Sequence, residues 1–196
     1  MRRLAKDARK VAEIGTFLGG SAETLLEAMP EDGHLITIDT FRGTPGSWAQ
    51  PKNGPNELAA FVSIRLARFA GRFTIIMGTS LDAADYVEDS SLDLVFIDGA
   101  HDYANVLTDL DTWLPKVKPT GVISGHDFEP YLPEGWTHRD VRKRAHVDHD
   151  PMTNIHYGVL AAVMDTFTRV ESWEDGSDGK ESTVWWAKPE WARKLA

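Results

Sequence analysis

The sequence predicts an α/β protein built on a doubly wound, mainly parallel sheet that is closed by an antiparallel pair of strands. Short apolar runs alternate with segments of helical apolar spacing as far as residue 128, and this alternation is typical of strands joined by crossover helices. The runs at 92–97 and 121–124 are largely apolar, as strands buried on both faces are. Two later β-rich segments flank turn-forming residues at 175–180, which favours a hairpin.

The individual elements follow from the same patterns. Strands are expected at 11–14, 34–39, 73–77, 92–97, 121–124, 168–173 and 182–189. Helices are expected at 1–10, 21–29, 56–70 and 156–167, within 78–89, and between the strands at 92–97 and 121–124. Residues 41–57, rich in Gly and Pro, are expected to form a loop at the ligand edge, with a plain surface insertion as the alternative. Residues 129–155 are polar and are expected to form a mobile flap or insertion over that edge.

Composition limits the classes of protein to which the chain can belong. We expect its 196 residues to form a single domain over 1–196, large enough to bury a core. The net charge of −9 argues against nucleic acid as a partner, and the absence of cysteine excludes disulfides, thiolate metal sites and cysteine nucleophiles. No signal-peptide pattern follows the basic residues 1–10, and no run approaches the roughly 20 apolar residues of a membrane span. We therefore expect a cytoplasmic protein with no membrane partner.

A glycine loop follows the first strand. Residues 13–21 read E-x-G-x-x-x-G-G-S. Gly15 permits a sharp turn and a close backbone approach to a ligand, and Ser21 can cap the next helix, whose N-terminus attracts an anion. A tight turn without a ligand is the alternative. The spacing differs from the G-x-G-x-x-G of dinucleotide folds, which disfavours a nicotinamide-dependent oxidoreductase.

An acidic residue, Asp39, ends the second strand. A carboxylate in that place suits a bidentate hydrogen bond to the hydroxyls of a ribose, although it could equally cap the turn that follows. Together with the glycine loop, the ribose interpretation is favoured. The two features indicate a nucleoside ligand that carries a carboxylate rather than a pyrophosphate.

Four titratable side chains follow the two central strands. Asp98 and His101 come after the strand at 92–97, and His126 and Asp127 come after the strand at 121–124. Because ligands of such sheets bind outside the carboxyl ends of the strands, we expect all four at one edge. Plainer interpretations are a turn cap for Asp98, a surface position for His101 and a structural role for His126.

The motifs F-I-D-G-A-H-D-Y at 96–103 and G-H-D-F at 125–128 carry a family resemblance. With the glycine loop, they make residues 11–128 resemble a class I S-adenosylmethionine-dependent, metal-dependent O-methyltransferase, especially the branch that methylates sugar hydroxyls (macrocin and mycinamicin types). The resemblance implies a Rossmann-like methyltransferase fold, S-adenosylmethionine as cofactor, a divalent metal expected to be Mg²⁺, and a saccharide or other small-molecule acceptor, such as a mycobacterial methylmannose polysaccharide. A catechol or other phenol is the alternative acceptor, and a non-catalytic cofactor-binding domain is the alternative role.

The resemblance also implies roles for single residues. The residues implied to bind the cofactor are Glu13, Gly15, Thr16 and Ser21 around its methionine end, Asp98 at its amino group, Asp39 at the ribose and Ser80 at the adenine. Asp98 and Asp127 would also ligate the metal, and His101 would be the general base. His126 stands where the family often has an acid, so it either joins the metal ligands or orients one of them.

Further residues bear on the acceptor and on the cover of the site. Two histidines of the late polar region, His146 and His149, have metal-ligand spacing if they lie on a helix or loop, but a solvated position is favoured for both. No stronger role is expected for His138 or His156. Trp48 and Trp136 lie in polar loops, where exposed indoles would suit a sugar. About ten residues precede the first strand, where the family usually has helices that cover the cofactor. We therefore expect cover from residues 129–155 or from a second subunit, and hence a homodimer.

Overall fold

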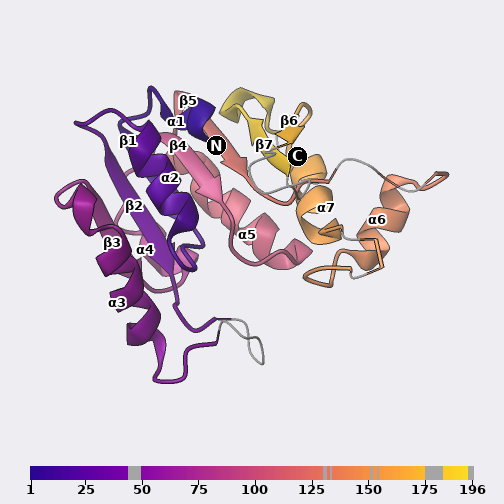
Figure 1. Cartoon of the computed structure of the whole chain (residues 1–196). Coiled ribbons are helices and arrows are strands. Elements are labelled where there is room, and N and C mark those ends of the chain that lie inside the picture. Colours follow the sequence, from indigo (N-terminus) through magenta and orange to yellow (C-terminus); the bar gives the residue numbers. More distant parts are fainter. Residues whose placement is uncertain are drawn as a thin grey trace.

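A single sheet organises the molecule. The computed structural model describes residues 1–43, 50–129, 132, 134–150, 152–153, 155–174 and 183–193. Over these residues, seven strands form one sheet in the order β3-β2-β1-β4-β5-β7-β6 (Figure 1). The strands are β1 (Lys10–Ile14), β2 (His34–Asp39), β3 (Phe73–Met77), β4 (Leu92–Ile97), β5 (Val117–Gly125), β6 (Glu171–Glu174) and β7 (Thr183–Ala187). Strands β1 to β5 pair in parallel, and β7 pairs antiparallel with both β5 and β6. The predicted fold class is confirmed.

Strands β1 and β4 lie where the strand order reverses. From β1 the chain moves outwards to β2 and β3, and it then returns to the other side of β1 to form β4 and β5. In open α/β sheets, ligands bind at such a reversal, outside the carboxyl ends of the strands. The register pairs Ile97 with both Ile14 and Gly125. The ends of β1, β4 and β5 are therefore level, and the residues that follow them share one edge.

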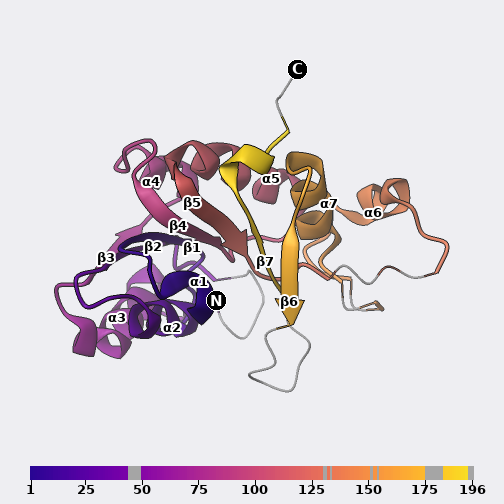
Figure 2. The ribbon, with the colours of Figure 1, turned by 90° about the horizontal axis from the view of Figure 1, so that it is seen from above.

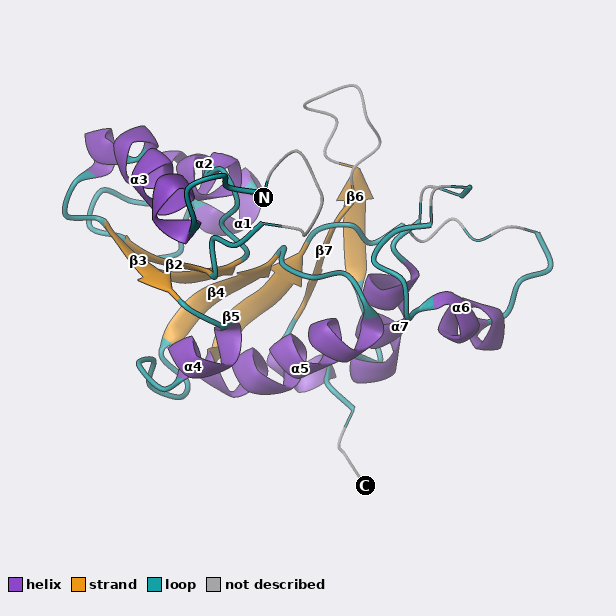
Figure 3. Ribbon diagram, turned by 90° about the horizontal axis from the view of Figure 1, so that it is seen from below, coloured by secondary structure: helices purple, strands orange, loops and turns teal. Residues whose placement is uncertain are grey.

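Helices cover both faces of the sheet. The helices are α1 (Arg2–Ala5), α2 (Gly20–Ala28), α3 (Pro55–Arg65), α4 (Ser80–Ala84), α5 (Tyr103–Trp113), α6 (His138–Arg144) and α7 (Tyr157–Thr166), with short 3-10 turns η1 (Ala67–Phe69), η2 (Leu114–Lys116) and η4 (Pro189–Trp191). α1, α2 and α3 lie on one face, and α4, α5 and α7 lie on the other (Figure 3). Val11 and Leu94 point into the core under α1, α2 and α3, whereas Ala12 and Val95 point into the core under α4, α5 and α7. The central strands are therefore apolar on both faces. Within the described ranges, no helix has the length and apolar character needed to cross a bilayer.

The segment 129–155 contains a helix that the sequence patterns did not predict. α6 begins with a capping box, in which the Thr137 side chain accepts from the backbone N–H of Asp140 while the Asp140 carboxylate accepts from the N–H of Thr137. This reciprocal pair satisfies two donors that a helix start otherwise leaves unpaired. α6 buries Val141, packs on α7 and stands outward of it (Figures 1 and 2).

Some predicted boundaries differ from the structure. Strand β5 begins at Val117, four residues before the predicted start, and an irregular register between Leu92 and Leu94 accommodates the extra length. The strand predicted at 168–173 is β6, and the predicted helix over 1–10 is limited to α1. The turn at 175–180 lies outside the described residues. The antiparallel pairing of β6 with β7 nevertheless confirms the closing pair.

Candidate active site

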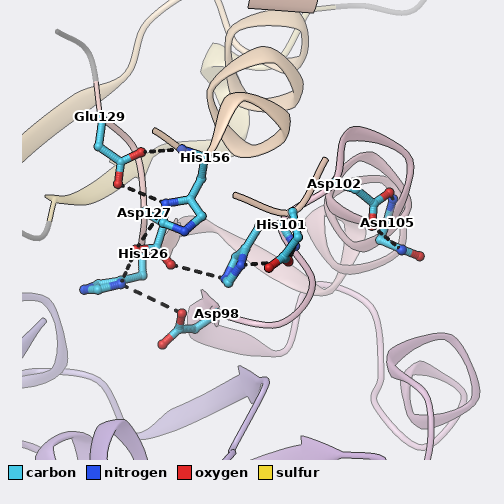
Figure 4. Close-up of polar contacts among 9 residues, drawn as sticks. Asp98, His101, Asp102, Asn105, His126, Asp127, Glu129 and His156 are labelled. Atoms are coloured by element: carbon cyan, nitrogen blue, oxygen red, sulfur yellow. Dashed lines mark hydrogen bonds and ion pairs between the residues drawn. The ribbon is translucent and has the colours of Figure 1, made fainter. Parts of the chain in front are cut away.

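The predicted site residues meet at the carboxyl edge of the central strands. Because β1, β4 and β5 end level, the residues directly after them, Gly15, Asp98 and His126, lie side by side. Asp127 and His101 join the same group, with 3.2 Å between His101 Nε2 and Asp127 Oδ2 (Figure 4). The structure thus brings together the four titratable side chains expected at this edge.

Gly15 allows the glycine loop to pass directly against the end of β4. Its φ is +93°, and a Cβ added there would lie 2.0 Å from the carbonyl oxygen of Asp98. The Gly15 N–H donates to the carbonyl of Ile38 at 2.9 Å, while the Asp98 N–H donates to that of Ile14 at 2.7 Å. Only glycine fits this position without a shift of the backbone. The loop is therefore a close-fitting cradle at the strand reversal.

Glu13 is buried near the end of β1. Its Oε2 accepts a 2.5 Å hydrogen bond from Thr37, whose hydroxyl is also 2.5 Å from that of Thr16. Burial raises the pKa of Glu13 to about 8, against hydrogen bonds from Ser21 and Thr37 that lower it. Glu13 thus holds a proton at neutral pH, and a cationic group placed beside it would favour its ionised form. The Thr16 side chain belongs to this buried network.

Asp39 ties the glycine loop to the loop after β2. Its Oδ2 accepts the backbone N–H groups of Thr16 at 3.0 Å and Phe17 at 2.8 Å, and its Oδ1 accepts that of Phe41 at 2.7 Å. The turn-capping role considered for this residue is therefore present. A carboxylate offers about four acceptor positions, so these three bonds leave capacity for a ribose hydroxyl, whose binding stays a prediction.

Ser80 lies in the loop that follows β3, at the start of α4. Its hydroxyl donates to Asp109 of α5, a buried carboxyl that the sequence patterns did not single out. Burial raises the pKa of Asp109 to about 6, although the bond from Ser80 lowers it. The neighbouring Gly78 N–H donates to the carbonyl of Asp39 at 3.0 Å. The Ser80 loop is thus fixed next to the end of β2, and its contact with adenine stays a prediction.

Asp98, His126 and Asp127 form the group predicted to hold a metal. One donor atom of each lies within 4.8 Å of the others; His126 Nδ1 is 3.1 Å from Asp127 Oδ1 and 3.9 Å from Asp98 Oδ1. Asp127 has a φ of +57°, a left-handed conformation that costs a residue with a Cβ about 1–2 kcal/mol. Backbone strain of this kind is concentrated at functional sites. Two carboxylates and an imidazole are donors that fit one divalent cation.

Mutual charges set the protonation of this group. Burial opposes ionisation of Asp127, but the hydrogen bond and charge of His126 lower the pKa of Asp127 to about 2. Burial lowers the pKa of His126, yet the carboxylates of Asp127 and Asp98 raise it to about 9. Burial raises the pKa of Asp98. This favours a protonated His126 at neutral pH, and a cation bound there would have to displace that proton.

His101 is held between two carboxylates. Its Nε2 faces Asp127, and its Nδ1 lies 3.1 Å from Oδ1 of Asp148, which also accepts the His101 backbone N–H at 3.3 Å. Burial lowers the pKa of His101, but Asp148 and Asp127 outweigh it and raise that pKa. Gly158 of α7 permits this placement, because a Cβ there would lie 2.1 Å from the His101 carbonyl oxygen. An imidazole fixed in this way is oriented to accept a proton at the centre of the site.

Three further residues complete the centre and were missed by sequence reasoning: Glu129, Asp148 and His156. Nδ1 of His156 is 3.1 Å from Glu129 Oε1, and its backbone N–H donates to Glu129 Oε2 at 3.0 Å. The His156 ring centroid lies 4.7 Å from that of His101. The polar composition of 129–156 was the available signal, but no spacing in it indicates which residues turn inward.

The other histidines of this region differ in their surroundings. The His149 ring lies 4.9 Å from that of His156, and His149 is half-buried, so it is less solvated than expected. His138 Nε2 lies 3.3 Å from Asp165 of α7 and helps to hold α6. His146 is exposed, as expected.

Trp136 does not offer the open indole that was expected. Its ring stacks on that of Tyr157 with centroids 5.5 Å apart, and the guanidinium of Arg144 lies 4.8 Å from its centre. The indole is therefore packed against the rest of the protein. Trp48 lies outside the described residues.

The strand order, the closing antiparallel pair and the glycine cradle at the reversal define the class of Rossmann-like methyltransferase folds. The model of one family, described as a methyltransferase domain, matches residues 12–128. The match covers more than half of the chain and contains the glycine loop together with Asp98, His101, His126 and Asp127, whereas Glu129, Asp148 and His156 lie beyond it. The chain belongs to this methyltransferase-domain family.

Two relatives with similar sequences come from bacteria. An uncharacterized protein of Sinorhizobium fredii is 31% identical over 125 residues, which are 62% of this chain and 13% of that protein. A protein of Mycobacterium sp. (strain KMS), whose name assigns it provisionally to the O-methyltransferases, is 36% identical over 92 residues, 47% of this chain and 37% of that protein. The chain thus spans well under half the length of these relatives.

Solved structures share the fold across nearly the whole chain. Cofactor-bound Rv0187 from MTB superposes with a TM-score of 0.66 at 19% identity, covering 95% of this chain and 76% of that one. The O-methyltransferase from Bacillus cereus in complex with SAH gives a TM-score of 0.61 at 19% identity, with the same coverage of both chains. At this level of identity, the likeness establishes the fold.

Proposed function

We propose that the chain transfers the methyl group of S-adenosylmethionine to a hydroxyl of a small-molecule acceptor. One observation carries the proposal: the glycine loop at Gly15 lies in contact with Asp98. Asp98 belongs to the group of acids and histidines at the carboxyl edge, here called the acid–histidine centre (Asp98, His101, His126 and Asp127). A cofactor held by the cradle would therefore border the groups that can activate a hydroxyl. Family membership and the O-methyltransferase named among the relatives support methyl transfer over hydride transfer.

The cofactor would supply a methyl group on a sulfonium centre. The strand-end acids Glu13 and Asp98 suit its cationic amino group. Burial raises the pKa of both carboxyls, and a cation beside them would lower those pKa values and favour the ionised form. Asp39 retains acceptor capacity for a ribose hydroxyl. The level ends of β1 and β4 keep these groups on one edge.

A divalent cation, expected to be Mg²⁺, would be held by Asp98, His126 and Asp127. Such an ion supplies a lowered pKa and a fixed position for a hydroxyl bound to it. Asp127 is ready to bind because its pKa is about 2. His126 must first lose a proton, since its pKa is about 9 without a cation. Binding of the cation therefore weakens as the pH falls.

His101 would take the proton of the acceptor hydroxyl. Asp148 holds Nδ1 of His101, which leaves Nε2 directed toward Asp127 at the centre. The raised pKa makes His101 a stronger base than a solvated histidine. Positioned general bases typically contribute about 10²- to 10⁴-fold to rate.

A saccharide is the proposed acceptor. An alcoholic hydroxyl is a weaker acid than a phenol, so it needs both devices found side by side here, the acid group for a cation and the paired imidazole. The sugar-type motifs at 96–103 and 125–128 support the same choice. A catechol or other phenol is the alternative acceptor. The homodimer stays a prediction, which a molar mass measured by light scattering would test.

The test is methyl transfer by the purified chain with Mg²⁺ and a panel of saccharides and catechols, measured as S-adenosylhomocysteine formed. We expect turnover with a saccharide, and we expect EDTA to abolish this turnover reversibly. Full activity in EDTA would remove the metal from the mechanism. Binding of NAD but not of S-adenosylhomocysteine would refute the methyltransferase assignment, and binding of the cofactor without turnover across the panel would favour a non-catalytic domain.

A further inference from the structure

A second group of metal-binding side chains adjoins the first. Among the residues that the structure describes, His101, Asp127 and His156 each present a donor atom within 4.8 Å of the other two. Asp127 belongs to both groups, whereas Asp98 and His126 belong only to the first. His156 has no part in the function proposed above. Its side chain nevertheless points toward Asp127 and His101 (Figure 4).

The distances in this second group suit a single small ion. His101 Nε2 is 3.2 Å from Asp127 Oδ2, and His156 Nδ1 is 3.7 Å from Asp127 Oδ1. Ligands at about 2.0–2.1 Å from Zn²⁺ in a tetrahedral arrangement lie about 3.3 Å apart. These two spacings are close to that value, and the third pair of donor atoms, on His101 and His156, lies within 4.8 Å. Oδ2 of Asp127 faces His101, whereas Oδ1 faces both His156 and His126 of the first group, so the two groups share this carboxylate.

A carboxylate outside this group holds the His101 imidazole, and a second carboxylate lies beside the donor atom of His156. Asp148 lies 3.1 Å from Nδ1 of His101, on the other side of the ring from the Nε2 that faces Asp127. Glu129 Oε1 instead lies 3.1 Å from Nδ1 of His156, the same nitrogen that faces Asp127 at 3.7 Å, so Glu129 stands beside the ion position as a further oxygen donor. Glu129 also accepts the His156 backbone N–H at 3.0 Å. Metal-binding histidines commonly have a carboxylate behind the ring, which fixes the orientation and raises the basicity of the ligand. The arrangement is thus organised beyond a chance meeting of side chains.

We infer that His101, Asp127 and His156 form a site for a borderline transition-metal ion such as Zn²⁺, distinct from the oxygen-richer group at Asp98. Two imidazoles and one carboxylate favour Zn²⁺ over Mg²⁺, which prefers oxygen ligands and keeps its water. Ion binding here does not depend on the proposed function. One consequence does: an ion on Nε2 of His101 removes the general base, so Zn²⁺ inhibits methyl transfer.

The test uses the metal-stripped full chain, titrated with Zn²⁺ in excess Mg²⁺ by calorimetry and with Co²⁺ by its visible absorption. The wild-type protein should bind Zn²⁺ at His101, Asp127 and His156. With Co²⁺ it should show the strong visible absorption bands of a four-coordinate ion that has nitrogen ligands. His156→Ala should weaken Zn²⁺ binding by more than about tenfold, and Asp148→Ala by about 10- to 100-fold. Asp98→Asn should retain this binding. His146→Ala, an exposed histidine of the same region, is the matched control.

Zn²⁺ affinity unchanged in both His156→Ala and Asp148→Ala would overturn the inference. So would a loss of Zn²⁺ binding in Asp98→Asn with retention in His156→Ala, because the ion would then occupy the first group. Circular dichroism checks that each variant is folded, and His156→Gln replaces His156→Ala if it is not. Absence of methyl transfer under every condition, with Zn²⁺ binding intact, would count against the proposed function and not against the site.

Discussion

Replacing Gly15 by alanine tests the contact between the glycine loop and strand β4. The added Cβ would lie 2.0 Å from the Asp98 carbonyl oxygen and 2.7 Å from Cα of Gly99, whereas ordinary contacts need about 3.5 Å. The loop or the strand end must therefore move by more than about 1 Å. The positive φ adds about 1–2 kcal/mol and overpacking about 1–3 kcal/mol. We expect the free energy of unfolding to fall by about 2–5 kcal/mol.

Gly71→Ala is the matched control for this substitution. Gly71 has a φ of +84°, and nothing lies within 4 Å of a Cβ added there. It should therefore show the conformational strain alone, about 1–2 kcal/mol. Urea unfolding measures both variants, and calorimetry with S-adenosylhomocysteine measures the effect on the cradle at a temperature where both are folded.

We expect Gly15→Ala to weaken cofactor binding markedly and Gly71→Ala to leave it unchanged. A shift of about 1 Å can also lower the rate of a positioned reaction by about a hundredfold. If Gly15→Ala lost no more stability than Gly71→Ala and bound the cofactor equally well, the close approach of loop and strand would not be what shapes the site.

Three further predictions concern single side chains. Asp127→Ala should abolish transfer and metal binding together; metal binding that survives in titration calorimetry would contradict this. His101→Ala should lower turnover by about 10²- to 10⁴-fold with little change in cofactor affinity, and an unchanged turnover would assign the base elsewhere. The pKa of Glu13 is raised in the fold from 4.5 to about 8, so its contribution to stability is present below pH 4.5 and is lost as the pH rises through 8. Glu13→Gln should therefore gain in unfolding free energy relative to wild type between pH 5 and pH 9, and a difference independent of pH in urea unfolding would refute the raised pKa.

The sheet and its active edge could be predicted because local patterns specify them. Apolar runs of strand length define β1 to β5, and the rule that parallel strands end at one edge brings Asp98 and His126 together without knowledge of any long-range contact. Gly15 was also recognisable from a local pattern, because a glycine directly after a strand indicates a turn in which the backbone passes close to a neighbouring group.

The outer part of the centre could not be predicted because it depends on contacts distant in sequence. Asp148 reaches His101 across 47 residues, and Glu129 reaches His156 across 27. The region between carries no periodicity that selects inward-facing residues. One signal was available and unused: Thr137 and Asp140 have capping-box spacing, which indicates the start of α6 and hence a folded segment.

A crystal structure of the chain with S-adenosylhomocysteine and Mn²⁺, whose anomalous scattering locates the ion, would test the proposed cofactor and metal sites together. We expect the ligand against the loop at Gly15, its ribose hydroxyls at Asp39, and an anomalous peak bound by Asp98, His126 and Asp127. A ligand bound away from the ends of β1 and β4, or no anomalous peak at those three side chains, would contradict this expectation.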